Sequence, residues 1–324
     1  AYPHLNPCAV SVTVGGHACF LLQCQNRNLL VDPNWARWLK VVKRLKHPGL
    51  HLHERPDIDL VLVTHAHFDH LDRKTLRKVA ADQLIVVPFE VGNRVHDLGF
   101  RSVHELGYWE SFKLGPLTVT LTPCAHWGAR VLHDTHRGFG GFIVEHAGRT
   151  VFHCGDTAYF AGFKEIAKRF KVDVALLPIG AYDPPRGREV HMNPEEALLA
   201  FTELGAKTFV PMHYGPFQLH YEPLEEQLRR LLARARHRGR GAAVGRGQGR
   251  ARGRVAGPER EVGRALAHVE DPGSREGKFM AMLKDRLAEG LLQRLVRPQV
   301  RHGRVVQERP RPRYQRRQGR TRHA

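Results

Sequence analysis

The stretch DLVLVTHAHFDHLD, residues 59–72, decides how this chain is interpreted. Its apolar part, residues 60–63, predicts a fully buried strand. Four candidate metal ligands follow this strand within six residues. Side chains two positions apart on an extended backbone point the same way, so we expect His65 and His67 to bind one ion together. A turn after His67 would direct the next two ligands toward a second ion nearby.

Further candidate ligands follow other predicted strands. His126 follows the alternating strand 114–123, Asp156 follows the hairpin ending at residue 154, and His213 follows the short strand 208–211. Strands that end at one edge of a layered sheet can bring such side chains together, although each is distant in sequence. We assign three ligands to one ion, three to a second ion, and one carboxylate between them: His65, His67 and His126; Asp69, His70 and His213; and Asp156.

This ligand set indicates a catalytic metal centre. Imidazole and carboxylate suit zinc and similar divalent metals, and seven ligands on two ions leave coordination positions open. Two ions about 3.5–4 Å apart can hold a bridging water and stabilise both the entering and the leaving oxygen. We therefore expect hydrolysis at phosphorus or at an activated carbonyl, with two zinc ions as cofactor and manganese or iron as alternatives. Asp69 and Asp156 would then be catalytic residues as well as ligands.

The remaining pattern alternates strands with helices. We expect two strands within residues 8–32 and others at 83–88, 140–145, 150–154 and 172–179, and we expect helices at 72–81, 163–170 and 193–204. Asn193 is the predicted N-cap of the last helix. Trp35 and Trp38 begin an irregular basic stretch, where they line a pocket mouth or, as we expect, pack against the sheet. His17 either approaches the metals or is an ordinary loop histidine, and both interpretations stay open.

Composition divides the chain in two. Of its 324 residues, 237–324 contain 23 Lys+Arg against 8 Asp+Glu, a net charge of +15, whereas residues 1–236 carry only +4. Five irregularly spaced cysteines favour reduced thiols and a cytoplasmic protein. No stretch reaches the apolar length of a membrane span, and no signal peptide opens the sequence.

The second part, residues 237–324, is rich in Arg and Gly and predicts a disordered tail. It has three interpretations: a nucleic-acid-binding arm, a tether to anionic membranes, or a GC-rich gene read out of frame. The arginine bias favours the last. The front, residues 1–236, contains no nucleic-acid-reading motif, so we do not expect nucleic acid as a partner.

Several segments together carry a resemblance to a known family. THAHFDHLD with the later ligands resembles the metallo-β-lactamase fold of dinuclear hydrolases. Further segments narrow the resemblance to the branch of the phospholipase D that hydrolyses N-acylphosphatidylethanolamine and to its bacterial relatives. These segments are the strand starting Gly140-Gly141-Phe142, CAHWGAR (124–130), GDTAYF (155–160), PIGAYDP (178–184), HMNPEEAL (191–198) and MHYG (212–215). The resemblance implies an α/β fold, the four-layered αβ/βα sandwich, with zinc at the sheet edges and the same seven ligands, in a hydrolase domain at residues 1–236.

The resemblance also suggests substrate contacts. His191 falls where this branch has a pocket histidine, and it is a candidate catalytic and substrate-binding residue. Tyr182 and Asp183 would lie on the loop beside the metals, with loop packing and turn formation as the alternatives. The implied activity is a phosphodiesterase acting on a phospholipid or small phosphodiester, with peripheral contact to the inner face of the membrane. A lactonase or other carbonyl hydrolase and a tail-dependent nucleic-acid-binding protein are the rival functions.

Overall fold

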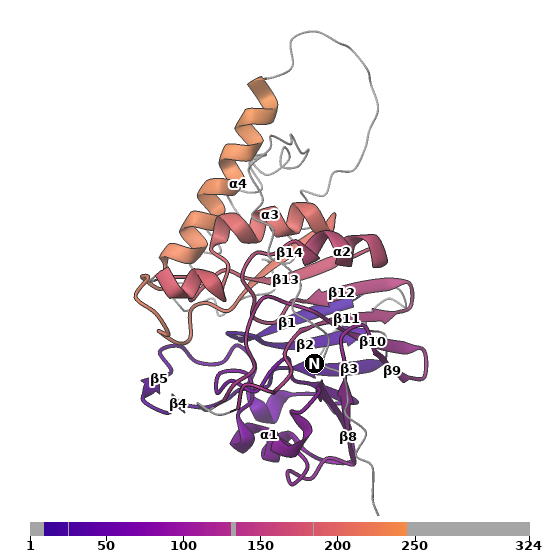
Figure 1. The fold of residues 1–324 in the computed structure, drawn as a ribbon. Coiled ribbons are helices and arrows are strands. Elements are labelled where there is room, and N and C mark those ends of the chain that lie inside the picture. The colour runs from indigo at the N-terminus through magenta and orange to yellow at the C-terminus, as the bar shows by residue number, and fades with distance from the viewer. Residues whose placement is uncertain (1–9, 25, 131–133, 184, 245–324) are drawn as a thin grey trace, which may run out of the picture.

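The protein is built from two facing β-sheets, each covered by helices on its outer side (Figure 1). The computed structural model describes residues 10–24, 26–130, 134–183 and 185–244. From the top of Figure 1 downward, the layers are helices, sheet, sheet and helix. This arrangement is the four-layered αβ/βα sandwich that the sequence predicted.

The first sheet has six strands in the order β1-β2-β3-β6-β7-β8. The first three run antiparallel, and each pair from β3 onward is parallel. Their bounds are β1 Val10–Gly16, β2 Cys19–Cys24, β3 Arg27–Val31, β6 Leu60–Leu62, β7 Leu84–Pro88 and β8 Ser102–Leu106.

The second sheet repeats this plan in the order β14-β13-β12-β11-β10-β9. Strands β9 to β12 are antiparallel, and β12, β13 and β14 pair in parallel. Their bounds are β9 Ser111–Leu114, β10 Leu117–Thr122, β11 Gly141–His146, β12 Arg149–His153, β13 Val174–Pro178 and β14 Thr208–Met212. In both sheets the parallel strands deliver their carboxyl ends to one edge, which is where polar side chains can gather.

The helices lie outside the sheets, and a small hairpin projects from the first half. Helix α1 (Arg73–Val79) covers the first sheet, while α2 (Gly162–Arg169), α3 (Pro194–Leu204) and α4 (Glu226–Val244) lie on the side of the second sheet (Figure 1). The hairpin pairs β4 (Trp38–Leu39) with β5 (Val42–Lys43). Three short 3-10 turns complete the list: η1 (Leu52–Glu54), η2 (Gly92–Arg94) and η3 (Pro185–Glu189). None of the described helices is both long and apolar enough to cross a bilayer.

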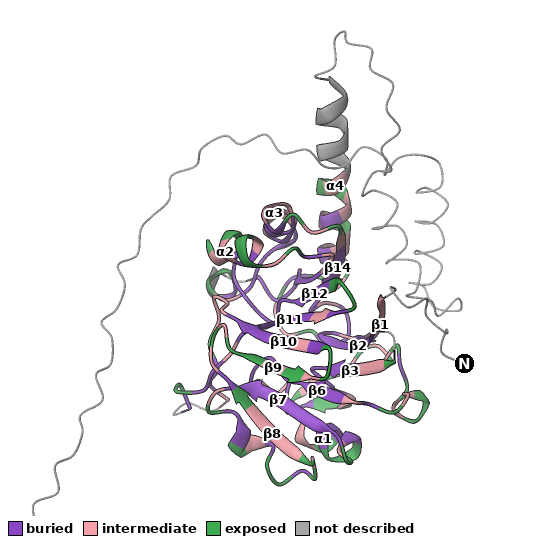
Figure 2. Cartoon of the chain, turned by 90° about the vertical axis from the view of Figure 1, so that its right-hand side faces the viewer, coloured by how far each residue is buried: buried purple, intermediate pink, exposed green. Residues whose placement is uncertain are grey.

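Strand β6 explains why the apolar run before the metal motif is continuous. Leu60 and Leu62 face the core between the two sheets, and Val61 and Val63 face the core beneath α1. A strand buried on both faces needs apolar residues at every position instead of alternate ones. Figure 2 shows the same pattern, because the central strands are drawn as buried along most of their length.

Most predicted elements are confirmed, with three differences in the strands. Residues 10–31 form three strands instead of two. The predicted strand 114–123 is divided by a turn, with β9 ending before Gly115 and β10 following it. Gly115 has a φ of 60°, a left-handed conformation that favours glycine. The edge strands β8 and β9 were not anticipated, although β9 shares its last residue with the predicted segment.

Two further expectations have mixed outcomes. Trp35 packs on the core as expected, and its Nε1 donates to the Leu50 carbonyl at 2.7 Å, but Trp38 is 53% exposed. Helix α4 continues past the boundary predicted at residue 236, to Val244. The rest of the predicted tail, residues 245–324, lies outside the described residues.

Candidate metal centre

All seven predicted ligands meet at the edge where the strands end. His65 and His67 follow β6, and His126, Asp156 and His213 follow β10, β12 and β14. The first sheet thus supplies the His-x-His-x-Asp-His motif and the second sheet supplies the remaining three ligands. The centre lies across the junction of the two halves.

Three imidazoles form the first group. His67 Nδ1 lies 2.9 Å from His65 Nε2 and 3.2 Å from His126 Nε2. Ligands of a tetrahedral zinc ion at about 2.1 Å lie about 3.4 Å from one another, so these nitrogens already have the spacing of a shared ion. The predicted assignment of these three side chains to one ion is consistent with this geometry.

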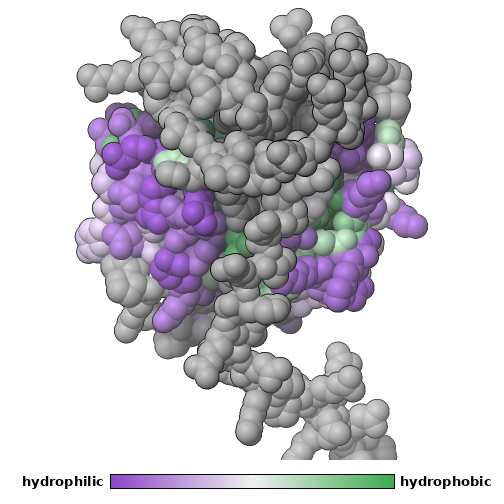
Figure 3. All heavy atoms as spheres, turned by 90° about the horizontal axis from the view of Figure 1, so that it is seen from above, coloured by the Kyte–Doolittle hydropathy of each residue, from purple (hydrophilic) through white to green (hydrophobic). Residues whose placement is uncertain are grey.

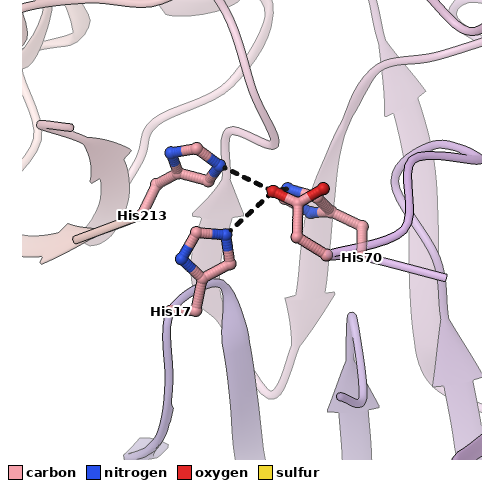
Figure 4. A group of neighbouring side chains, drawn as sticks. His17, His70 and His213 are labelled. Atoms are coloured by element: carbon pink, nitrogen blue, oxygen red, sulfur yellow. Dashed lines mark hydrogen bonds and ion pairs between the residues drawn. The ribbon is translucent and has the colours of Figure 1, made fainter. Parts of the chain in front are cut away.

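The second group surrounds Asp69. Its Oδ2 lies 3.2 Å from His213 Nε2 and 3.5 Å from His70 Nε2. His17 joins this group, since its Nε2 is 3.0 Å from the same oxygen and its ring centroid is 4.1 Å from that of His213. Figure 4 shows the imidazoles of His17 and His213 directed at this carboxylate, with His70 beside it. Of the two interpretations of His17, the structure therefore favours the one that places it at the metals.

Asp156 connects the two groups through a single oxygen. Its Oδ2 lies 2.9 Å from His213 Nε2 and 3.1 Å from His70 Nε2. The same atom is 3.9 Å from both His65 Nε2 and His126 Nε2. Asp156 thus occupies the position expected of a carboxylate between two ions.

Buried acceptors fix the orientation of the ligand rings. His70 donates from Nδ1 to Asp32 Oδ2 at 2.6 Å, and His126 donates from Nδ1 to the Val190 carbonyl at 3.0 Å. Asp32 also accepts from the backbone N–H and the hydroxyl of Thr64, both at 2.7 Å. These bonds direct Nε2 of each ring toward the centre, as outer partners of metal-bound histidines commonly do. Sequence reasoning treated Asp32 only as the end of a strand and missed this role.

The electrostatics differ between the two groups. Burial lowers the pKa of His126 to about 3 and that of His65 well below its ordinary value, so both imidazoles are neutral at pH 7. Burial also acts to lower the pKa of His213, but the carboxylates of Asp156 and Asp69 outweigh it and raise that pKa to about 9. A metal ion bound by these residues would take the place of such a proton, because it would supply positive charge to the same carboxylates.

Several buried polar atoms at the centre have no hydrogen-bond partner among the described residues. They include Asp156 Oδ1, His67 Nε2 and His213 Nδ1. Unsatisfied buried carboxylate oxygens are costly in a folded protein, and their presence among clustered imidazoles fits a site that is completed by cations. The nitrogen and oxygen donors present suit zinc and related divalent metals.

The predicted substrate-contact residues have different surroundings. His191 is buried beside the centre, with its ring stacked on His213 at 5.1 Å between centroids and its Nδ1 3.9 Å from Asp156 Oδ2. Tyr182 instead donates to Glu226 of α4 at 3.2 Å, which favours its packing role. Asp183 is exposed and its backbone N–H donates to Glu222, so its predicted contact with substrate stays a prediction.

Comparison with known proteins identifies the class. A family model described as the beta-lactamase superfamily domain matches residues 27–214, more than half of the chain. The chain therefore belongs to the β-lactamase superfamily, as its fold and ligand motif indicated. Several of its relatives are named metal-dependent hydrolases.

Three relatives show how close this membership is. A Mycobacterium tuberculosis protein is 33% identical over 239 residues, which cover 70% of this chain and 64% of that protein. A metal-dependent hydrolase of Rubrobacter xylanophilus is 34% identical over 64% of this chain and 82% of its own length. The mitochondrial N-acyl-phosphatidylethanolamine-hydrolyzing phospholipase D of Saccharomyces cerevisiae is 31% identical over 69% of this chain and 51% of its own. The match thus spans less than two thirds of the first and third relatives.

A solved structure supports the same assignment. Igni18, a metallo hydrolase from the archaeon Ignicoccus hospitalis, superposes with a TM-score of 0.54 and 27% identity, covering 69% of this chain and 91% of its own. The similarity therefore includes the fold as well as the sequence.

Proposed function

We propose that this protein is a metal-dependent hydrolase, and specifically a dinuclear zinc phosphodiesterase of the kind that releases phosphatidic acid from N-acylphosphatidylethanolamine. The observation that carries the proposal is the position of Asp156 Oδ2, which is within 3.9 Å of ligand nitrogens from both groups. The choice of substrate rests on the similarity to the yeast phospholipase D and on the motif segments surrounding the ligands.

The roles of individual residues follow from their contacts. Two zinc ions would supply an activated water and stabilise negative charge on the phosphoryl oxygens. Asp32 holds the His70 ring so that Nε2 faces the centre. Burial lowers the pKa of His191 well below its usual range, so this residue is a neutral imidazole that can donate one N–H to a phosphoryl oxygen.

The proposal predicts both metal content and activity for Asp156→Asn. The wild-type chain should bind close to two equivalents of zinc and release phosphatidic acid from N-acylphosphatidylethanolamine. The variant loses a negative charge shared by both ions, so zinc content should fall toward one equivalent and turnover by at least about 100-fold. Elemental analysis and a phosphatidic acid assay on the same preparations measure both effects.

Asp97→Asn is a suitable control, because Asp97 is a surface residue paired with Arg73 away from the ligands. It should retain two ions and full activity. One ion in the wild-type chain would reject the dinuclear assignment, and two ions with normal turnover in Asp156→Asn would reject the bridging role of Asp156 on which it rests. If the wild-type chain binds two ions and hydrolyses lactones or thioesters but no phosphodiester, the proposed phospholipid substrate is rejected. The alternative function, a carbonyl hydrolase, is then favoured.

A further inference from the structure

The hairpin of β4 and β5 exposes apolar side chains to solvent. Across residues 37–45, here called the basic hairpin, Trp38 is 53% exposed, Val41 is 87% exposed and Leu45 is 54% exposed. Val41 lies at the tip, directly after Lys40, which adopts a left-handed φ of 53° in the turn. In Figure 1 the hairpin projects from the lower left of the molecule, away from α2 and α3. Exposed apolar side chains that gather in one short segment, unlike those scattered singly, indicate a candidate interaction surface.

The same segment is strongly basic. Between Asp32 and Glu54 the sequence contains five Lys or Arg residues and no Asp or Glu. Arg37, Lys40 and Lys43 are exposed and alternate with the exposed apolar residues. By contrast, the surface seen from above in Figure 3 is mostly hydrophilic where described residues are visible, with smaller hydrophobic areas.

The basic hairpin is fastened to the loops that carry the metal ligands. At its base, Asn34 Nδ2 donates to the carbonyls of Phe68 and Asp69 at 3.1 and 2.8 Å. The Lys40 ammonium lies 3.9 Å from the centre of the Phe68 ring. On the other side, the Leu45 N–H donates to the Pro216 carbonyl at 2.8 Å, within the loop that follows His213. Any surface that the hairpin contacts is therefore held beside the metal centre.

We propose that the basic hairpin docks the protein on an anionic lipid bilayer. Cationic side chains are attracted to anionic headgroups, and Trp and aliphatic side chains enter the boundary between headgroups and acyl chains. Nucleic acid would match the charge but not the exposed Val41 and Leu45. The inference relates to the proposed function, because it places the metal centre at the surface where a phospholipid substrate lies, but docking itself requires no turnover.

Quenching by brominated lipids tests the proposal in the whole chain of 324 residues. The tail, residues 237–324, contains no Trp, so a tail-mediated tether gives no quenching of its own. Vesicles of phosphatidylglycerol and phosphatidylcholine with brominated acyl chains should quench the wild-type fluorescence, and Trp38→Phe should remove most of that quenching. Vesicles of phosphatidylcholine alone should give little. Unchanged quenching in Trp38→Phe, or quenching without anionic lipid, would overturn the proposal.

Charge variants supply the matched comparison. Lys40→Gln/Lys43→Gln should weaken partition into the anionic vesicles about 30-fold. Lys164→Gln/Lys168→Gln on α2 removes two lysines whose side chains are 66% and 77% exposed, and it should have little effect. Equal losses of vesicle binding in the two double variants would reject the docking proposal. Binding of the hairpin to DNA or to a second copy of the chain, with Trp38 unquenched by lipid, would also reject it.

Failure of docking can be separated from failure of the proposed activity. If the protein docks on vesicles but releases no phosphatidic acid, the docking proposal is supported and the proposed phosphodiesterase activity is rejected. If the protein hydrolyses detergent-dispersed phospholipid but does not dock on vesicles, the proposed activity is supported and the docking proposal is rejected.

Discussion

Asp32 shows how much a single buried residue contributes to the metal centre. It is fully buried at the end of β3, and its carboxylate accepts from three donors, two of them on Thr64 and one on His70. An amide in its place has one acceptor oxygen and an NH₂ group that faces donors. We expect Asp32→Asn to weaken binding of the second zinc about 10- to 100-fold, measured by competition with a chelating dye.

Asp59→Asn is the matched control for this substitution. Asp59 lies just before β6, at the end opposite the ligands, and pairs with Arg27 at 2.7 Å. Its replacement should leave both metal affinities unchanged. If the two variants bind zinc equally well, Asp32 does not orient His70.

The sequence predicted the candidate metal ligands more readily than the residues that support them. The motif from His65 to His70 and the later ligands carry the chemistry in their residue types and in their positions after strands. Asp32 and His17 carry no such signal, because an aspartate in a turn and a histidine after two glycines have common alternatives. Their roles depend on β3 and the β1–β2 turn lying beside β6 and β14, which only the tertiary structure establishes.

At the scale of elements, the start of α3 fixes the backbone that leads from His191 into the helix. Asn193 accepts from the Glu196 N–H at 2.9 Å, and Glu196 accepts from the Asn193 N–H at 3.1 Å, which forms a capping box. We expect Asn193→Ala to reduce the free energy of unfolding by about 1 kcal/mol, measured by urea denaturation. Asn193→Asp keeps the acceptor and should cost little. Equal destabilisation by the two substitutions would contradict the capping role.

The predictability of elements follows their burial. The helix beginning at Asn193 and the buried strand β6 were evident, because a cap sequence and a continuous apolar run are strong local signals. Strands β8 and β9 are at the outer edges of the two sheets, and only Leu106 among their residues is buried. Edge strands with polar, exposed positions lack the apolar pattern that marks a strand in sequence.

At the scale of the whole molecule, the metal centre joins the two halves of the sandwich. His65 and His67 extend from the first sheet, and Asp156 and His213 extend from the second. Metal ions that bind only the folded state stabilise it by about 2.7 kcal/mol at a free concentration of 100 times Kd. We expect a chelator to lower the melting temperature, as followed by calorimetry.

Asp156→Asn offers an internal comparison for this experiment. It should already have lost one ion, so the chelator should shift its melting temperature less than that of the wild type. A melting temperature that is the same with and without chelator would show that the ions do not contribute to joining the halves.

The distribution of ligands over both sheets also has a consequence during protein synthesis. His213 follows β14, the last of the described strands, so a nascent chain that has not yet released this strand from the ribosome lacks one candidate ligand of the second group. The loop that follows His213 must also be present before Leu45 can bond to Pro216. The proposed hydrolysis therefore requires that translation has passed both halves, because the candidate centre is incomplete before that point.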